Sequence, residues 1–153
     1  MSEKNTAKYI VQDLHEPPMP SEEYRAMYNR FAKRILWIDG DLVPGAFQTN
    51  TSWYCKIPEK NPVFEEHAHN CDELIAFIGS NPDDRYDLGG ELELWLDGEH
   101  HIITRSTLIF VPANMPHMPL KFNRVDRPIF HFSVVMDPLY DGDAYQDKGG
   151  QGK

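Results

Sequence analysis

Four residues in the middle of the chain have side chains that bind metal ions in proteins. His67 and His69 are separated by one residue, Glu73 follows four residues later, and His117 comes after the turn sequence Pro-Ala-Asn-Met-Pro. Because side chains of an extended segment alternate between its two faces, His67 and His69 point the same way. Imidazole and carboxylate groups are ligands of divalent transition metals. The spacing therefore predicts one metal site made of His67, His69, Glu73 and His117.

The elements that must position these residues are predicted to be short β-strands. Alternation with a period of two residues, typical of strands, begins after Gly45, and Asp97-Gly98 is a two-residue hairpin signal. Residues 80–90 form a polar stretch that we expect to be a loop. Short strands without interleaved helices indicate an all-β sandwich or barrel. The predicted strands are Phe47–Ile57, Glu73–Ile78, Glu91–Leu96, Glu99–Thr104, Thr107–Val111, His117–Phe122 and Ile129–Met136.

One helix is predicted ahead of the strands, from about Ser21 to Lys33. Ser21 is a typical N-cap, and apolar side chains from Tyr24 to Ile35 recur at helical spacing. The proline-rich residues before it are expected to form an extended arm, and the Gly- and Asp-rich end a disordered tail. The predicted organisation is therefore an arm and helix in residues 1–45, a barrel in residues 46–137 and a tail in residues 138–153.

The composition limits the class of partner. The chain has 15 basic and 24 acidic residues in 153, a net charge of −9, which argues against nucleic acid and against an anionic membrane surface. The first residues contain no apolar signal segment, no run is long enough to span a membrane, and two cysteines are too few for a disulfide framework. We expect a cytoplasmic protein whose partner is a small molecule.

The order of the metal-binding residues resembles the two sequence motifs of the cupin superfamily. The first motif ends in His-x-His followed by Glu, as His67, His69 and Glu73 do here, and the second contains Pro-x-Gly-x-x-His, matched by Pro112, Asn114 and His117. Asn in place of Gly at 114 is compatible with a left-handed turn. The sequence departs from the motifs at other turn positions: Gly79 lies one residue early, Ser106 stands for Gly and Lys121 for Asn.

The resemblance covers roughly residues 47–136 and implies a cupin-type double-stranded β-helix, a jelly-roll barrel. It also implies one divalent transition metal ion, with Fe or Mn expected first and Zn, Ni, Co or Cu as alternatives, and a homodimer completed by the arm. Because cupins include oxygenases, lyases, isomerases and binding proteins, the resemblance leaves three hypotheses open. The chain is a metal-dependent enzyme acting on a small oxygenated substrate, a non-catalytic metal-containing binding protein, or a structural or storage protein whose metal only holds the strands together.

Several residues near the motifs are candidates for further roles. Glu73 itself, Glu93 and His131 are the candidate acid–base groups, with Glu93 entering the cavity only if the opposite face, Leu92 and Leu94, packs outward. Cys71 is a candidate soft ligand, although a loop thiol or a small buried residue is the simpler interpretation. A carboxylate substrate would need a cation in the barrel mouth, and the nearest cations in the sequence are Arg105, Lys121, Arg124 and Arg127.

Overall fold

The computed structural model describes residues 4–137 and contains one α-helix, one short 3₁₀ helix and eight strands. Within residues 4–137, no helix is long and apolar enough to cross a membrane. In chain order, the elements are η1 (Ala7–Tyr9), α1 (Glu22–Phe31), β1 (Ala32–Ile38), β2 (Gln48–Tyr54), β3 (Glu73–Ile78), β4 (Asp87–Leu96), β5 (Glu99–Arg105), β6 (Thr107–Val111), β7 (His117–Val125) and β8 (Ile129–Val135).

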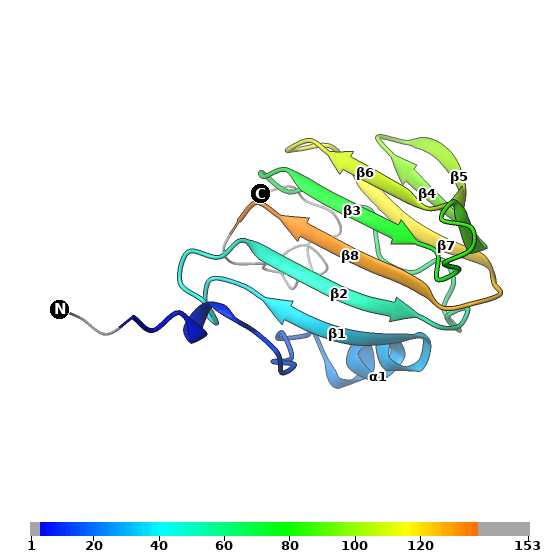
Figure 1. Cartoon of the computed structure of the whole chain (residues 1–153). Coiled ribbons are helices and arrows are strands. Elements are labelled where there is room, and N and C mark those ends of the chain that lie inside the picture. Colours follow the sequence, from blue (N-terminus) through cyan, green and yellow to red (C-terminus); the bar gives the residue numbers. More distant parts are fainter. Residues whose placement is uncertain (1–3, 138–153) are drawn as a thin grey trace.

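The strands form two antiparallel sheets that pack face to face. The larger sheet has the order β1-β2-β8-β3-β6, and the smaller one has the order β5-β4-β7. Figure 1 shows the larger sheet in front, with β4, β5 and β7 behind it and α1 beside the β1 edge. Apart from the neighbouring pairs β1-β2 and β4-β5, sequential strands lie in different sheets or skip a neighbour, as in a jelly roll. The prediction of an all-β jelly-roll fold is confirmed.

The helix is shorter than predicted, and the strand that follows it was missed. The Ser21 side chain accepts a hydrogen bond from the Tyr24 backbone amide (3.0 Å), which caps the helix as expected. The helix ends at Phe31, and the chain continues directly into β1, which pairs with β2 from Ala32 opposite Tyr54 onward. Ile35 therefore lies in a strand, because pairing with β2 overrides the helical spacing of the sequence. Part of the segment assigned to the arm and helix thus belongs to the larger sheet.

The hairpin between β4 and β5 has the predicted turn. Asp97 and Gly98 both have positive φ angles (48° and 77°), as a type I′ turn requires. The predicted loop at residues 80–90 is too long, because β4 begins at Asp87. Gly90 explains part of this extension, since a Cβ there would lie 2.4 Å from the Arg124 carbonyl oxygen of the neighbouring β7. A residue without a side chain therefore lets the two strands approach each other.

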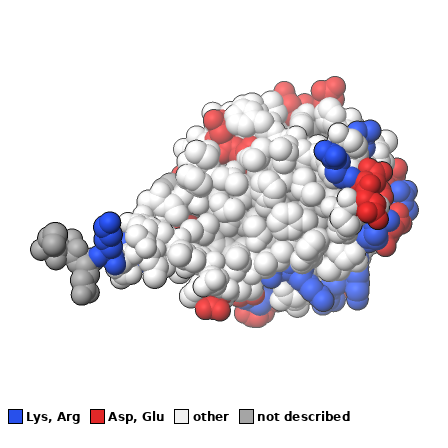
Figure 2. Space-filling view, in the orientation of Figure 1, with Lys and Arg blue, Asp and Glu red and all other residues white. Residues whose placement is uncertain are grey.

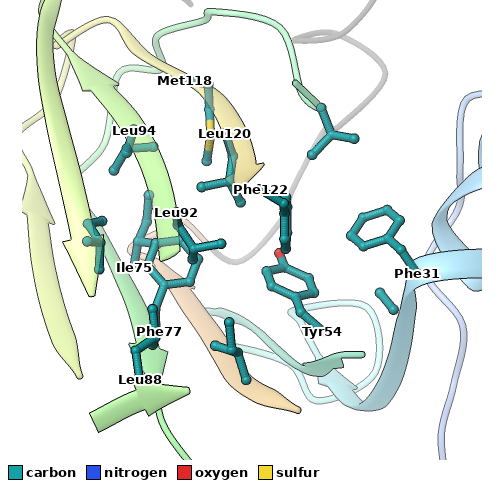
Figure 3. Close-up of a cluster of buried hydrophobic side chains, with 14 of the residues drawn as sticks. Phe31, Tyr54, Ile75, Phe77, Leu88, Leu92, Leu94, Met118, Leu120 and Phe122 are labelled. Atoms are coloured by element: carbon teal, nitrogen blue, oxygen red, sulfur yellow. The ribbon is translucent and has the colours of Figure 1, made fainter. Parts of the chain in front are cut away.

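The core lies between the two sheets. Leu92 and Leu94 of β4 and Leu120 of β7 are completely buried and face Ile75 and Phe77 of the larger sheet (Figure 3). Burying a Leu or Phe side chain contributes about 1.5–3 kcal/mol to stability, so this layer is a main source of the folding free energy. The helix joins the same core through its last residue, since Phe31 lies edge-on to Phe122, with ring centroids 5.6 Å apart.

The arm reaches the space between the sheets near its open end. Pro17, Pro18, Met19 and Pro20 line a cavity whose other walls come from the larger sheet, α1 and β7. Arg25 of α1 holds the arm through an ion pair with Glu16 (3.0 Å). The predicted tail, residues 138–153, lies outside the described residues. The arm thus closes part of the opening through which the interior would be reached.

Candidate metal centre

His117 meets His67 and His69, which lie about fifty residues earlier in the sequence, at one end of the sheets. His117 begins β7, and its backbone exchanges two hydrogen bonds with His67: His67 N to His117 O (3.1 Å) and His117 N to His67 O (2.9 Å). The segment around His67 is otherwise extended without being a regular strand. The candidate ligand nitrogens of His67, His69 and His117 all lie within 4.8 Å of one another, and all three residues are buried.

The backbone fixes the orientation of each imidazole. The Nδ1 atoms of His67, His69 and His117 lie 2.7, 3.0 and 2.9 Å from the carbonyl oxygens of Glu65, Cys71 and Met115, respectively. A carbonyl oxygen can only accept, so Nδ1 carries the proton in each neutral ring. In its neutral form each ring therefore presents the lone pair of Nε2 toward the cluster. This is the tautomer that a metal-binding histidine requires.

Glu73 at the start of β3 adds a carboxylate to the cluster. Its Oε2 atom lies 2.8 Å from His69 Nε2 and 3.1 Å from His117 Nε2. Burial alone would raise the pKa of Glu73, but the contacts with His117 and His69 outweigh it and lower the pKa to about 2. For His67 the effect of burial, with the neighbouring His117, lowers the pKa to about 4. At neutral pH, Glu73 is therefore an anion and His67 a neutral imidazole.

The donor set fits a metal ion. His117 Nε2 is buried without a hydrogen-bond partner among the described residues, in spite of its distance to Glu73. A lone pair facing a carboxylate oxygen is repulsive unless a proton or a metal ion lies between them. Three imidazole nitrogens with one carboxylate suit Fe, Mn, Co, Ni, Cu or Zn. The geometry thus brings together all four ligands that the sequence predicted.

A cavity of about 120 Å³ adjoins the cluster between the sheets. Its walls include His67 and Glu73, and its apolar part comes from aromatic rings and from Ile75 and Met118. The polar part of the wall comes mostly from the inward face of the larger sheet. A cavity with a few convergent polar groups and an otherwise apolar lining is typical of small-molecule sites. The polar side chains of the larger sheet at this wall are Arg34, Gln48, Asn50, His131 and Ser133.

His131 belongs to this wall. Its ring is stacked on Tyr54 (centroids 4.8 Å apart, 11° between planes) and lies 5.4 Å from Phe77. Its Nδ1 atom lies 3.0 Å from the Ala76 carbonyl oxygen, so Nε2 is an acceptor. Burial, the largest effect, lowers the pKa of His131 to about 4. At neutral pH the ring is therefore an uncharged hydrogen-bond acceptor.

Glu93 lies on the other side of the smaller sheet. The condition for its entry into the cavity is not met, because Leu92 and Leu94 point into the core. The Glu93 carboxylate instead contacts His100 Nε2 (2.6 Å) and Lys121 Nζ (3.0 Å), and the hydrogen bond from Lys121, with weaker contributions from its neighbours, lowers its pKa. Of the candidate acid–base groups, Glu73 and His131 line the cavity, whereas Glu93 faces outward.

The remaining candidates lie outside the cluster of Nε2 atoms. Cys71 Sγ is 3.8 Å from His69 Nδ1, on the side of the ring away from the other imidazoles, and burial raises the pKa of its thiol. Its carbonyl oxygen, not its sulfur, orients His69. None of the four cations singled out in the sequence lines the cavity. Arg34 does line the cavity, and it was not among the predicted residues because the strand that carries it was not predicted.

Comparison with known proteins agrees with this architecture. No family model matches the chain, and no curated protein has a significantly similar sequence. Among solved structures, oxalate oxidase in complex with the substrate analogue glycolate is similar with a TM-score of 0.54 and 12% identity, over 91% of this chain and 64% of that one. A second structure of oxalate oxidase with glycolate gives 0.53 and 11%, over 90% and 63%. The chain has the cupin fold.

A further cupin among the similar structures is a sugar phosphate isomerase from Silicibacter pomeroyi, with a TM-score of 0.47 and 18% identity, over 72% of this chain and 61% of that one. The chain thus spans less than two thirds of the length of these three cupins. At these identities the likeness concerns the cupin fold and not the reaction. The cupin motifs found in the sequence fall on the buried histidines: the positive φ angle of Asn114 (68°) allows the turn before His117.

Proposed function

We propose that the chain is a metal-dependent cupin enzyme that acts on a small oxygenated organic substrate. The observation that supports this is the convergence of three buried imidazole groups and the Glu73 carboxylate beside a cavity. His67, His69, Glu73 and His117 would hold one divalent transition metal ion, with Fe or Mn expected first. When bound, the ion supplies a Lewis acid for a substrate oxygen or a site for dioxygen chemistry.

The chain's own residues would bind and orient the substrate. The arm residues and the aromatic side chains would exclude water from the cavity, which strengthens every polar contact inside it. His131 Nδ1 donates a hydrogen bond to the Ala76 carbonyl oxygen, so Nε2 carries no proton. Nε2 would therefore accept a hydrogen bond from a substrate hydroxyl. Glu73 would remain an anion at neutral pH because its pKa is about 2. Oxygenase, lyase and isomerase chemistry are all compatible with these groups.

The metal is tested by elemental analysis of protein purified without chelator at neutral pH. About one Fe, Mn, Co, Ni, Cu or Zn per chain is expected, and a His67→Ala/His69→Ala variant should lose it because two of the four ligands are removed. The matched control is His100→Ala/His101→Ala, since these adjacent histidines are exposed and lie outside the cluster. Equal metal content in the two double variants would contradict the assignment, and so would a wild-type protein that takes up no metal on reconstitution.

The enzyme is distinguished from a non-catalytic binding cupin by the fate of the ligand. Small acids, alcohols and sugars are incubated with the metal-loaded protein, with and without dioxygen, and the mixture is analysed by mass spectrometry. A product that forms with the wild type but not with His67→Ala/His69→Ala supports the enzyme. Binding that depends on the metal, without any change in the bound molecule, would instead favour the binding protein.

A homodimer is part of this proposal. The outward face of the larger sheet carries apolar side chains on adjacent strands, among them Leu108 and Phe110 of β6, which are 62% and 61% exposed. Leu74, Phe130 and Phe132 continue this face across β3 and β8. Figure 2 shows this face as a broad area with few charged residues. Because the chain as a whole carries a charge of −9, an uncharged face is the part of the surface on which two copies repel each other least.

A further inference from the structure

Arg34 of β1 lies in the cavity wall in an unusual environment for a cation. Its guanidinium carbon is 4.7 Å from the centroid of the Tyr28 ring and 5.3 Å from that of Trp37. One end of the guanidinium, Nη1, donates a hydrogen bond to Asn50 Oδ1. The side chain is thus held between two aromatic rings and anchored by one amide. Such cation–π contacts stabilise a guanidinium but do not neutralise its charge.

The charge of Arg34 has no counterion within residues 4–137. No carboxylate pairs with it there, and its Nε atom is buried without a hydrogen-bond partner. Arg124 and Arg127, in contrast, pair with Asp126 and Asp87, although Arg127 Nε is also buried without a hydrogen bond. Arg105, which lacks a carboxylate partner as well, is exposed to solvent over the Tyr86 ring. Arg34 is half-buried, and a buried Nε–H donor without a partner is costly unless an acceptor such as an anion binds it.

We propose that Arg34 binds the carboxylate of the substrate, and that this enzyme therefore acts on an organic acid. The Nε edge of a guanidinium offers two parallel N–H donors, which match the two oxygens of a carboxylate. This inference rests on the proposed function, since it places the acid group of the substrate at Arg34 and the reacting group at the metal centre. It also explains why a negatively charged chain keeps a cation inside its cavity.

The strand register places Arg34 at a suitable distance from the metal centre. The Nη1 atom reaches Asn50, which is paired with Ser133, and Ser133 is paired with Ile75. Two strand spacings of about 4.8 Å separate Asn50 from Ile75, roughly 10 Å. Glu73 lies two residues from Ile75 on the same face of β3. The guanidinium and the metal cluster are therefore at opposite sides of one cavity, which a small molecule can bridge.

Arg34 is the only Lys or Arg side chain among the described residues that line the cavity. An acid group is therefore attracted to the guanidinium, across the cavity from His67 and Glu73. The side chains between them, Asn50, Ser133 and His131, are uncharged at neutral pH. A phosphate could use the same guanidinium edge, so the test must separate the two anions.

The test is the preference of the protein for an acid over its uncharged amide. Butyrate is compared with butyramide, and benzoate with benzamide, by calorimetric titration of the metal-loaded protein at pH 7. Wild type should bind each acid at least about tenfold more tightly than the amide. Arg34→Met should lose that preference while keeping its affinity for the amide. Phenyl phosphate is the second probe. If wild type binds phenyl phosphate more tightly than benzoate, the carboxylate assignment is wrong and the site binds a phosphate.

Two variants separate the proposed contact from effects on folding. Arg34→Lys keeps the charge but not the paired donors, so it should retain only part of the preference. Arg105→Met removes an arginine that also lies over a tyrosine ring but is outside the cavity, and should leave the preference unchanged. Circular dichroism confirms that each variant is folded. A wild type that binds no acid more tightly than its amide overturns the proposal, and so does an Arg34→Met protein that keeps the preference.

The titration repeated on His67→Ala/His69→Ala distinguishes this inference from the proposed function. If that variant keeps a preference for acids that Arg34→Met abolishes, the anion site is correct, whatever the metal content shows. If the preference depends on the metal ligands and not on Arg34, the acid binds at the metal and the inference about Arg34 is wrong. In that case the proposed metal site remains supported.

Discussion

His131 should make the stability of the protein fall as the pH is lowered from 7 to 5. Burial between Tyr54 and Phe77 lowers its pKa from the ordinary 6.5 to about 4 in the folded protein. In the unfolded chain the ring is exposed and titrates normally. Between these two values the unfolded state binds the proton more tightly, so protonation favours unfolding. The contribution of a neutral His131 is complete above pH 6.5 and is lost as the pH falls toward 4.

The magnitude follows from the two pKa values. The pKa of His131 is 6.5 in the unfolded chain and about 4 in the folded protein. At pH 5 the tighter proton binding of the unfolded chain therefore lowers the free energy of unfolding by about 2 kcal/mol. At pH 7 the same difference in pKa lowers it by only about 0.2 kcal/mol. Removing the titrating ring in His131→Gln should therefore reduce the difference in unfolding free energy between pH 7 and pH 5 by about 2 kcal/mol. The Gln amide can still donate to the Ala76 carbonyl.

The assay is urea unfolding of metal-free protein at pH 7 and pH 5, followed by circular dichroism. Metal-free protein is used so that release of an ion does not add to the pH dependence, and the other histidines contribute equally to wild type and variant. His101→Gln, at an exposed position of β5, is the control and should show the wild-type pH dependence. If His131→Gln loses as much stability between pH 7 and pH 5 as the wild type does, His131 is not held neutral by the fold, and our reasoning about the cavity wall is wrong.

Two further predictions concern the two faces of the sheets. Phe110→Asp should convert a dimer to a monomer in light scattering, because it buries a charge in the proposed interface. Ile102→Asp is the control and should leave the dimer intact, because Ile102 is equally exposed, at 61%, but lies on the smaller sheet. A monomeric wild type would contradict the interface. Leu92→Ala should lower the unfolding free energy by about 2–5 kcal/mol, because it leaves a cavity between the sheets. Glu93→Gln should have a much smaller effect in the same urea titration and should leave turnover unchanged, since this residue faces outward; equal losses for both would contradict the assignment of faces.

The cluster of His67, His69, Glu73 and His117 could be predicted because the information about it is local. The His-x-His spacing in an extended segment and the turn before His117 determine side-chain directions within a few residues, and the order of motifs resembled a known superfamily. The long-range part, the pairing of His67 with His117, follows from the fold that this resemblance implied. What the sequence did not show is the backbone carbonyls that fix each Nδ1 atom, because any residue can supply them.

Arg34 was missed for a physical reason. Tyr24, Met27, Tyr28, Phe31 and Ile35 share one helical spacing, and that periodicity continues into residues that belong to β1. No Pro or Gly separates the two elements, so nothing local ends the helix at Phe31. The helix ends there because the following residues pair with β2, a contact between segments about twenty residues apart. A cation inside the cavity was expected for an acid substrate, but its strand could be found only from this pairing.

The strand β2 buries its polar face, which is the opposite of what its sequence pattern predicts. Its alternation defines two faces, and the ordinary rule would bury the face with Trp53 and leave the amides in water. The structure does the reverse: Gln48, Asn50 and Ser52 are buried, whereas Trp53 is only half-buried. Local and tertiary preferences conflict in this way mainly at functional sites.

The conflict in β2 has a consequence for each face. The buried polar row is satisfied in part by the fold, through Arg34 with Asn50 and Tyr28 with Ser52 (2.6 Å), and its remaining polar groups line the cavity for a ligand. The apolar side chains on the other face are then left at the surface, where a second copy of the chain would cover them. One inverted strand thus links the proposed anion site between the sheets to the proposed dimer interface on the outer face. Variants of Asn50 should therefore change the preference for acids, and variants of Phe110 the oligomeric state, each without affecting the other.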